Sequence, residues 1–128
     1  MATYDHFYDL PVYKICRTFR KRISDIVRQK FPGNEEYRLK GQVLNASRSV
    51  TANLAEGFGR FHHQENIQFC RQARGSLTET MDHMIVAFDD GFISEEVLKE
   101  INNEYKACLR DLNGYIKYLK TAKASATQ

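Results

Sequence analysis

The chain has 128 residues, of which 42% are hydrophobic, and a formal net charge of +3 at pH 7. This length suits one domain with a buried core, and no apolar run approaches the roughly 20 residues of a transmembrane helix. The first residues lack the basic and then apolar pattern of a signal peptide, so we expect a cytoplasmic protein. Cys16, Cys70 and Cys108 are odd in number and widely spaced, which predicts buried free thiols and argues against a disulfide framework or a zinc site.

The first predicted helix covers residues 8–31. Pro11 falls in its first turn, where the missing N–H is tolerated, and Phe31 before Pro32 predicts its end. Its apolar residues alternate steps of four and three, as in a helix packed within a bundle: Val12, Cys16, Phe19, Ile23 and Ile26.

Positive charge is concentrated in the first half of the chain. Residues 1–60 contain 11 Lys and Arg against 6 Asp and Glu, whereas residues 61–128 contain 8 against 10. The candidate nucleic-acid-binding residues lie in the first helix, all but Arg20 on one side of it: Lys14, Arg17, Arg20, Lys21 and Arg28. On a single helix, such a basic side is usually no more than a solvent-exposed surface. The alternative is a binding site for a polyanionic partner, which the small number of neighbouring acidic residues favours.

The second predicted helix covers residues 35–60, with Asn34 as its N-cap and Glu35 and Glu36 in its first turn. Gly57 and Gly59 weaken its end. A stripe of polar residues runs along it at intervals of four, three and four: Ser49, Asn53, Glu56 and Arg60. Small residues accompany this stripe, so we expect a neighbouring helix to approach closely: Ala46, Ser47, Ala52, Ala55 and Gly57.

The third and fourth predicted helices cover residues 63–90 and 95–121. Gly91 is the expected C-cap of the third helix, Ser94 is the expected N-cap of the fourth, and residues 123–128 form a frayed tail.

Arg74 interrupts the apolar seam of the third helix. A buried arginine must be paired, so we expect it to pair with Glu56 or with a neighbouring subunit. The expected structural polar network therefore comprises these residues: Ser49, Asn53, Glu56, Arg60 and Arg74.

Four helices with short connections predict an all-α fold, an antiparallel up-down-up-down four-helix bundle that forms one domain over residues 1–128.

A di-iron site in such a bundle needs Glu-x-x-His pairs, and no Glu in this chain has His three residues later. No serine has an evident base, and the glycines at 57 and 59 lack the Lys-Ser/Thr of a phosphate loop. We expect no metal, no cofactor, no catalytic residues and no enzymatic activity.

Several motifs together resemble one family, the four-helix-bundle proteins of 23S rRNA intervening sequences. The central motifs are the run Asn53-Leu-Ala-Glu-Gly-Phe-Gly-Arg60, then Glu65 and Phe69, then Ala73-Arg-Gly-Ser76. Further matches are Asp9-Leu-Pro-Val-Tyr-Lys14, Phe31-Pro32, Glu36-Tyr37 and Gly91-Phe-Ile-Ser94. His62 stands where this family usually has Ser or Thr, which predicts a poorer cap for the third helix.

The resemblance implies a ring-shaped homopentamer without enzymatic activity. Relatives include the accessory variability proteins that assist reverse transcriptases in diversity-generating retroelements, and these bind nucleic acid. We therefore expect a non-catalytic accessory protein that holds an RNA or DNA backbone, associated with rRNA or with a reverse transcriptase and not with a membrane. The alternative is a protein-interaction scaffold with no nucleic-acid role. Strong salt dependence, and sensitivity to Arg17→Glu or Lys21→Glu, would distinguish the first from the second.

Overall fold

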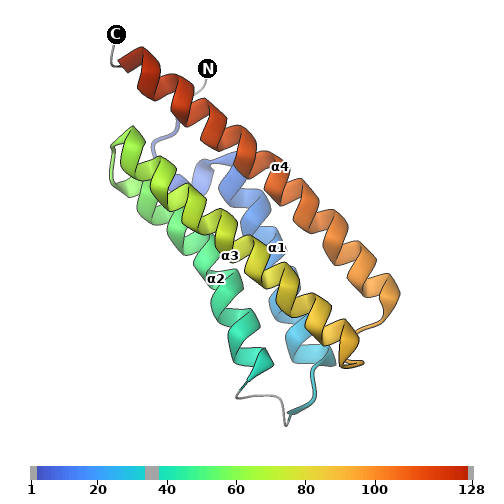
Figure 1. Ribbon diagram of the computed structural model, residues 1–128. Coiled ribbons are helices and arrows are strands. Elements are labelled where there is room, and N and C mark those ends of the chain that lie inside the picture. Colours follow the sequence, from blue (N-terminus) through green and yellow to red (C-terminus); the bar gives the residue numbers. More distant parts are fainter. Residues whose placement is uncertain (1–2, 34–37, 127–128) are drawn as a thin grey trace.

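The computed structural model describes residues 3–33 and 38–126, and this part of the chain is helical without any strand. A short 3-10 helix, η1 (Phe7–Asp9), precedes four long helices: α1 (Pro11–Lys30), α2 (Leu39–Gly59), α3 (His63–Asp89) and α4 (Glu95–Ala126). Each helix packs against the next along the chain, and α1 also packs against α4 (Figure 1). The predicted all-α, antiparallel up-down-up-down bundle is confirmed.

Helix α1 begins at Pro11, three residues later than predicted. Leu10 is extended, with φ −63° and ψ 131°, because the residue before a proline avoids the helical region. The same effect ends the helix, since Phe31 before Pro32 has ψ 138°. The described part of α2 begins at Leu39 and not at residue 35, and the expected cap at residues 34–36 lies outside the described residues.

Helices α3 and α4 are joined by the expected caps. Gly91 has φ +82°, its N–H donates to Phe88 O at 3.0 Å, and the Phe92 N–H donates to Ala87 O at 2.8 Å. These two bonds satisfy the last carbonyls of α3 in a Schellman motif. The hydroxyl of Ser94 accepts from the Val97 N–H at 3.2 Å and caps α4. The predicted C-cap and N-cap are both confirmed.

Two predictions about helix ends have different outcomes. The side chain of His62 makes no cap hydrogen bond, so the poorer cap at the start of α3 is confirmed. Helix α4 extends beyond its predicted end at residue 121 and continues through residues 123–126, where a frayed tail was expected. Alanine and lysine favour the helical state, and three of these four positions carry them.

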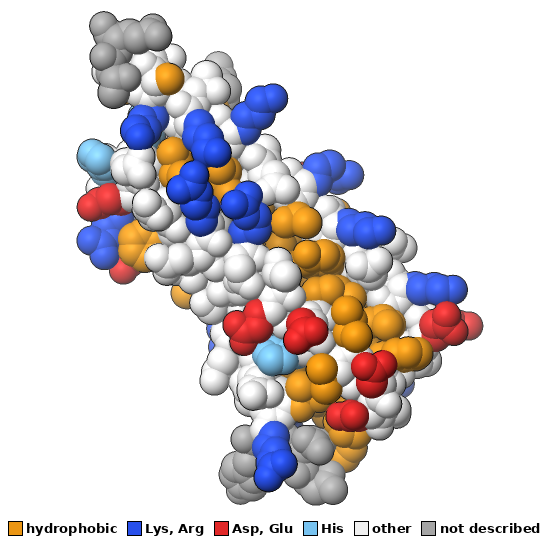
Figure 2. All heavy atoms as spheres, viewed as in Figure 1, with side chains coloured by type: hydrophobic (Ala, Val, Ile, Leu, Met, Phe, Trp, Pro, Cys, Tyr) orange, Lys and Arg blue, Asp and Glu red, His pale blue; other side chains and the backbone are white. Residues whose placement is uncertain are grey.

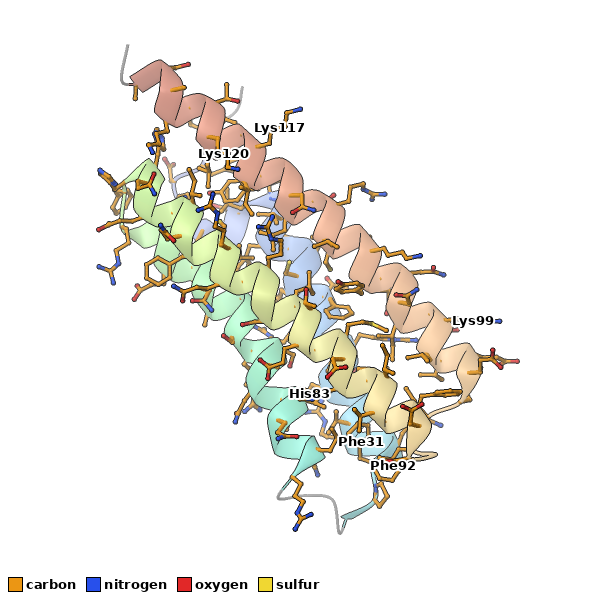
Figure 3. All side chains as sticks on the ribbon, viewed as in Figure 1. Phe31, His83, Phe92, Lys99, Lys117 and Lys120 are labelled. Atoms are coloured by element: carbon orange, nitrogen blue, oxygen red, sulfur yellow. The ribbon has the colours of Figure 1, made fainter. Side chains whose placement is uncertain are left out.

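The core runs along the whole bundle, with completely buried side chains such as Ile23, Leu54, Leu77 and Ile101 from the four helices. At one end Phe31 and Phe92 pack with ring centroids 5.5 Å apart (Figure 3), which joins the loop after α1 to the loop after α3. The three cysteines are buried and free, as predicted. The neighbouring Cys108 thiol and burial raise the pKa of Cys16, and burial raises the pKa of Cys70 to about 12.

Candidate nucleic-acid interface

Helix α1 presents its basic residues on the side opposite the core. Lys14, Arg17, Lys21 and Arg28 are exposed, whereas Arg20 is half-buried. Arg20 lies at the edge of this surface, where its Nη1 donates to Thr51 Oγ1 on α2 at 2.7 Å. This bond fixes the guanidinium against α2.

A basic groove of about 420 Å³ lies between α1 and α2. Its walls are Arg20, Lys21, Ser24, Asp25 and Arg28 from α1, with Leu44, Ser47 and Arg48 from α2. The two antiparallel helices thus bring Arg48 beside three of the five predicted binding residues. Sequence reasoning missed Arg48, because nothing in the sequence fixes which residues of α2 lie opposite the basic half of α1.

Much of the groove's positive charge is not neutralised by the protein. Arg28 pairs with Asp25 at 2.5 Å, and among the described residues that line the groove this aspartate is the one carboxylate. Over residues 3–33 and 38–126, no carboxylate lies within ion-pair distance of Lys14, Arg17, Lys21 or Arg48. These four cations are therefore available to an external anion.

Arg22 points the other way, toward α4. Its Nη2 lies 2.6 Å from Glu100 Oε2, and its Nε lies 3.5 Å from Glu104 Oε2. The Nε and the Glu104 oxygen are both buried without a hydrogen bond, so the contact with Glu100 is the better aligned of the two. This cation joins two helices and does not belong to the binding surface.

The expected polar network exists only in part. Asn53 Nδ2 donates to Ser49 Oγ at 3.0 Å, and Ser76 Oγ donates to the same hydroxyl at 3.0 Å, which links α2 to α3. Glu56 pairs with Arg60, the C-cap residue of the same helix, at 3.5 Å and on the exposed surface.

Arg74 does not pair with Glu56, the first of its two expected partners, and a pairing with a neighbouring subunit stays a prediction. Arg74 Nη1 instead donates to Asn113 Oδ1 on α4 at 2.8 Å. Ala73, which is fully buried, occupies the core position of this turn. A shift of one residue turns a helical side chain by about 100°, which takes Arg74 away from α2 and toward α4.

A second basic surface lies over the start of α3 and the end of α4, where Lys and Arg side chains gather in Figure 2. Lys117 and Lys120 belong to this end of α4, while Lys99 stands near its opposite end (Figure 3). A hollow of about 300 Å³ there is lined by Arg71, Lys120 and Lys123 together with Gln64 and Ile67. Sequence reasoning missed it because the charges of residues 61–128 sum to −2.

The distribution of charge along α4 explains why the net charge of residues 61–128 did not indicate this basic surface. Its first turns carry acidic residues and its last turns carry lysines, so the two signs cancel in a sum but lie at opposite ends of a 32-residue helix. The acidic residues of the first turns are Glu95, Glu96, Glu100 and Glu104, with Lys99 among them, and the lysines of the last turns are Lys117, Lys120 and Lys123.

Metal sites and membrane spans are two further features that bear on the kind of site. Throughout the described residues, no group of three or more His, Cys, Asp or Glu side chains is placed to hold a metal ion. Within the same ranges, no helix has the length and apolar character needed to span a bilayer.

Fold and surface charge together define a small four-helix-bundle protein with two basic surfaces. The family model described as 23S rRNA-intervening sequence protein matches residues 8–114, and the chain belongs to this family. The chain is also similar to the crystal structure of a protein of unknown function from the S23 ribosomal protein family of Bacteroides thetaiotaomicron VPI-5482. The two are 22% identical with a TM-score of 0.76 over 83% of this chain and 95% of the other, which shows the shared fold. No curated protein sequence matches the chain.

Proposed function

We propose that this protein is a non-catalytic accessory protein that binds RNA or DNA in the cytoplasm as a homo-oligomer. The observation that carries the proposal is the groove between α1 and α2, where Lys21 and Arg48 have no carboxylate partner among the described residues. The family description supports ribosomal RNA as the associated polymer. A role beside a reverse transcriptase rests on the resemblance to retroelement accessory proteins.

The binding mechanism is electrostatic. Phosphates of the polymer lie along the exposed side of α1 and in the groove, and counterions released from the polymer drive the association. Four available cations per subunit give a slope of log K against log salt of about −3 for a single strand. Backbone contacts of this kind carry little sequence information, so we expect tolerance of sequence and sensitivity to salt.

Assembly multiplies this weak binding. A ring of five subunits, which the family resemblance implies, presents the groove five times and converts later contacts into intramolecular ones. An apolar band between α3 and α4, visible across the lower part of the face in Figure 2, supplies a surface for such assembly.

The test is the binding of a single-stranded RNA and the matching DNA across a salt titration, with Arg48→Glu as the variant. We expect Arg48→Glu to weaken binding and to reduce the salt slope by at least about one, because a phosphate contact is lost. Lys99→Glu is the matched control, since it makes the same charge change at an exposed lysine of α4 that does not line the groove. Equal losses in both variants would contradict a localised groove.

The alternative function is a protein-interaction scaffold, which the apolar band between α3 and α4 favours. A scaffold binds no polymer even at low salt, and its partner contacts depend on apolar surface. Absence of binding to RNA and DNA would therefore exclude the accessory function and leave the scaffold.

A further inference from the structure

A cleft of about 760 Å³ opens at the end of the bundle where α2 turns into α3. Segments that are distant in the sequence meet there: the N-terminal segment at Tyr4, the turn at residues 58–62, the start of α3 and the end of α4. It shares no lining residue with the basic groove, and Leu119 of its lining belongs to the core. Its lining has two chemical parts, an aromatic wall and a polar rim.

The aromatic wall is made of Tyr4, Phe58, Phe61, Tyr115 and Tyr118. Phe58 and Phe61 have ring centroids 6.1 Å apart, and the rings of Tyr115 and Tyr118 are stacked with centroids 6.2 Å apart. Phe61 is 84% exposed and its φ is +54°, in the left-handed region that non-glycine residues rarely adopt. Phe61 follows the C-cap of α2, where its N–H donates to Phe58 O at 3.2 Å, and most of its ring stays open to solvent beside the cleft.

The floor of the cleft is an ordered polar pair. Asn66, which is 7% exposed, donates from Nδ2 to the hydroxyl of Tyr115 at 3.2 Å and accepts from the Cys70 thiol at 3.5 Å. Burial raises the pKa of Tyr115 to about 12, so the hydroxyl is protonated at neutral pH. Its oxygen accepts from Asn66, which leaves its hydrogen to donate to an occupant.

The rim of the cleft is positive. Lys123, whose ammonium donates to Gln64, lines both this cleft and the neighbouring hollow with Arg71 and Lys120. Neither hollow has an Asp or Glu among its described lining residues.

We propose that the cleft binds an unpaired base of a single-stranded nucleic acid, stacked on Phe61 and Tyr118, with the adjacent phosphates on Arg71, Lys120 and Lys123. This inference rests on the proposed function and adds to it a second site that recognises bases. Aromatic rings beside a cationic track are the arrangement by which proteins hold single strands, because every base has a face that stacks. The cleft thereby selects single strands over duplexes, whose bases are already stacked.

The test compares two chains of equal length and equal phosphate number, an oligothymidylate carrying one central 2-aminopurine and a fully abasic oligomer. We expect the base-bearing chain to bind about tenfold more tightly than the abasic one. The 2-aminopurine fluorescence should fall on binding, because stacking quenches it.

Phe61→Ala and Tyr118→Leu are the diagnostic variants, and Phe61 is exposed enough that its removal leaves the fold intact. Each should remove most of the tenfold preference while the affinity for the abasic oligomer stays the same. Tyr8→Ala is the matched control, because Tyr8 is 52% exposed and lies outside the cleft. The Tyr8→Ala variant should keep the full tenfold preference for the base-bearing oligomer over the abasic one.

Equal affinity of the wild-type protein for the two oligomers would overturn the base site. A loss in Phe61→Ala that is the same for both oligomers would overturn it as well. In either case, salt-dependent binding that Arg48→Glu weakens would leave the proposed function standing. The two proposals therefore fail separately.

Discussion

Gly57 is the residue that sets how closely α2 approaches α3. A Cβ at this position would lie 2.6 Å from Asn66 Oδ1 and 2.8 Å from Phe69 Cβ, distances that real Cβ atoms do not show. Asn66 is also the floor of the aromatic cleft. One glycine therefore supports both the packing of two helices and the geometry of the cleft.

Gly57→Ala should lower the free energy of unfolding by about 1–3 kcal/mol, because the overpacked contact outweighs the better helix propensity of alanine. Urea unfolding followed by circular dichroism measures this. Gly114→Ala is the control, since a Cβ there meets nothing within 4 Å and the change should stabilise α4 by about 0.5–1 kcal/mol. A Gly57→Ala variant that is more stable than the wild type would contradict this, because α2 and α3 would then accommodate the added methyl group at little cost.

Cys70 and Tyr115 should make the protein sensitive to alkali. In the folded state their pKa values rise to about 12 from ordinary values of 9.0 and 10.0, so folding favours the protonated groups. Their contribution is fully present below pH 9 and is lost as the pH rises from there toward 12, by up to about 1.4 kcal/mol per pH unit for each group. Denaturant unfolding between pH 8 and 11 should show this decline, and Cys70→Ala should flatten it. If the unfolding free energy of Cys70→Ala falls with pH as steeply as that of the wild type, the Cys70 thiol is not a cause of the alkali sensitivity.

At the scale of helices, Arg22 is a polar link between α1 and α4, the pair with the least extensive packing among neighbouring helices. Arg22→Ala should destabilise the protein by about 1 kcal/mol, since its partners are half-exposed and solvent screens the pair. Arg28→Ala removes a local pair within α1 and should change stability by less than about 0.5 kcal/mol. Thermal unfolding at low and high salt measures the stability change of each variant, and the loss in Arg22→Ala should be smaller at high salt.

The sequence predicted helices better than it predicted surfaces. Gly91 and Ser94 are local signals, so the junction of α3 and α4 could be located from the chain alone. The direction of Arg74 could not, because one residue of helical phase decides whether it faces α2 or α4. Arg48 joins the groove only through the alignment of two antiparallel helices, and the aromatic cleft only through the meeting of distant segments. Such sites need the tertiary structure.

At the scale of the whole molecule, we expect the exposed apolar surface to form the contacts of the proposed assembly, in which each subunit would carry its own basic groove. Ile85 is 42% exposed and lies three helical turns after Arg74, so it shares the side of α3 that turns toward α4. A band of apolar side chains occupies the space between these helices (Figure 2). We expect this band to be buried when subunits assemble.

Ile85→Glu should therefore reduce the mass in solution to that of a single chain of 14.9 kDa, because a carboxylate in an apolar interface is costly. Light scattering after size exclusion measures the mass, and circular dichroism checks that the helices remain. Affinity for a long single strand should fall far more than affinity for a short one, since a strand long enough to reach several subunits loses its multivalent contacts while a single groove keeps its own. An unchanged mass would place the subunit contacts on another face. A lost assembly with unchanged affinity for the long strand would separate oligomerisation from nucleic-acid binding.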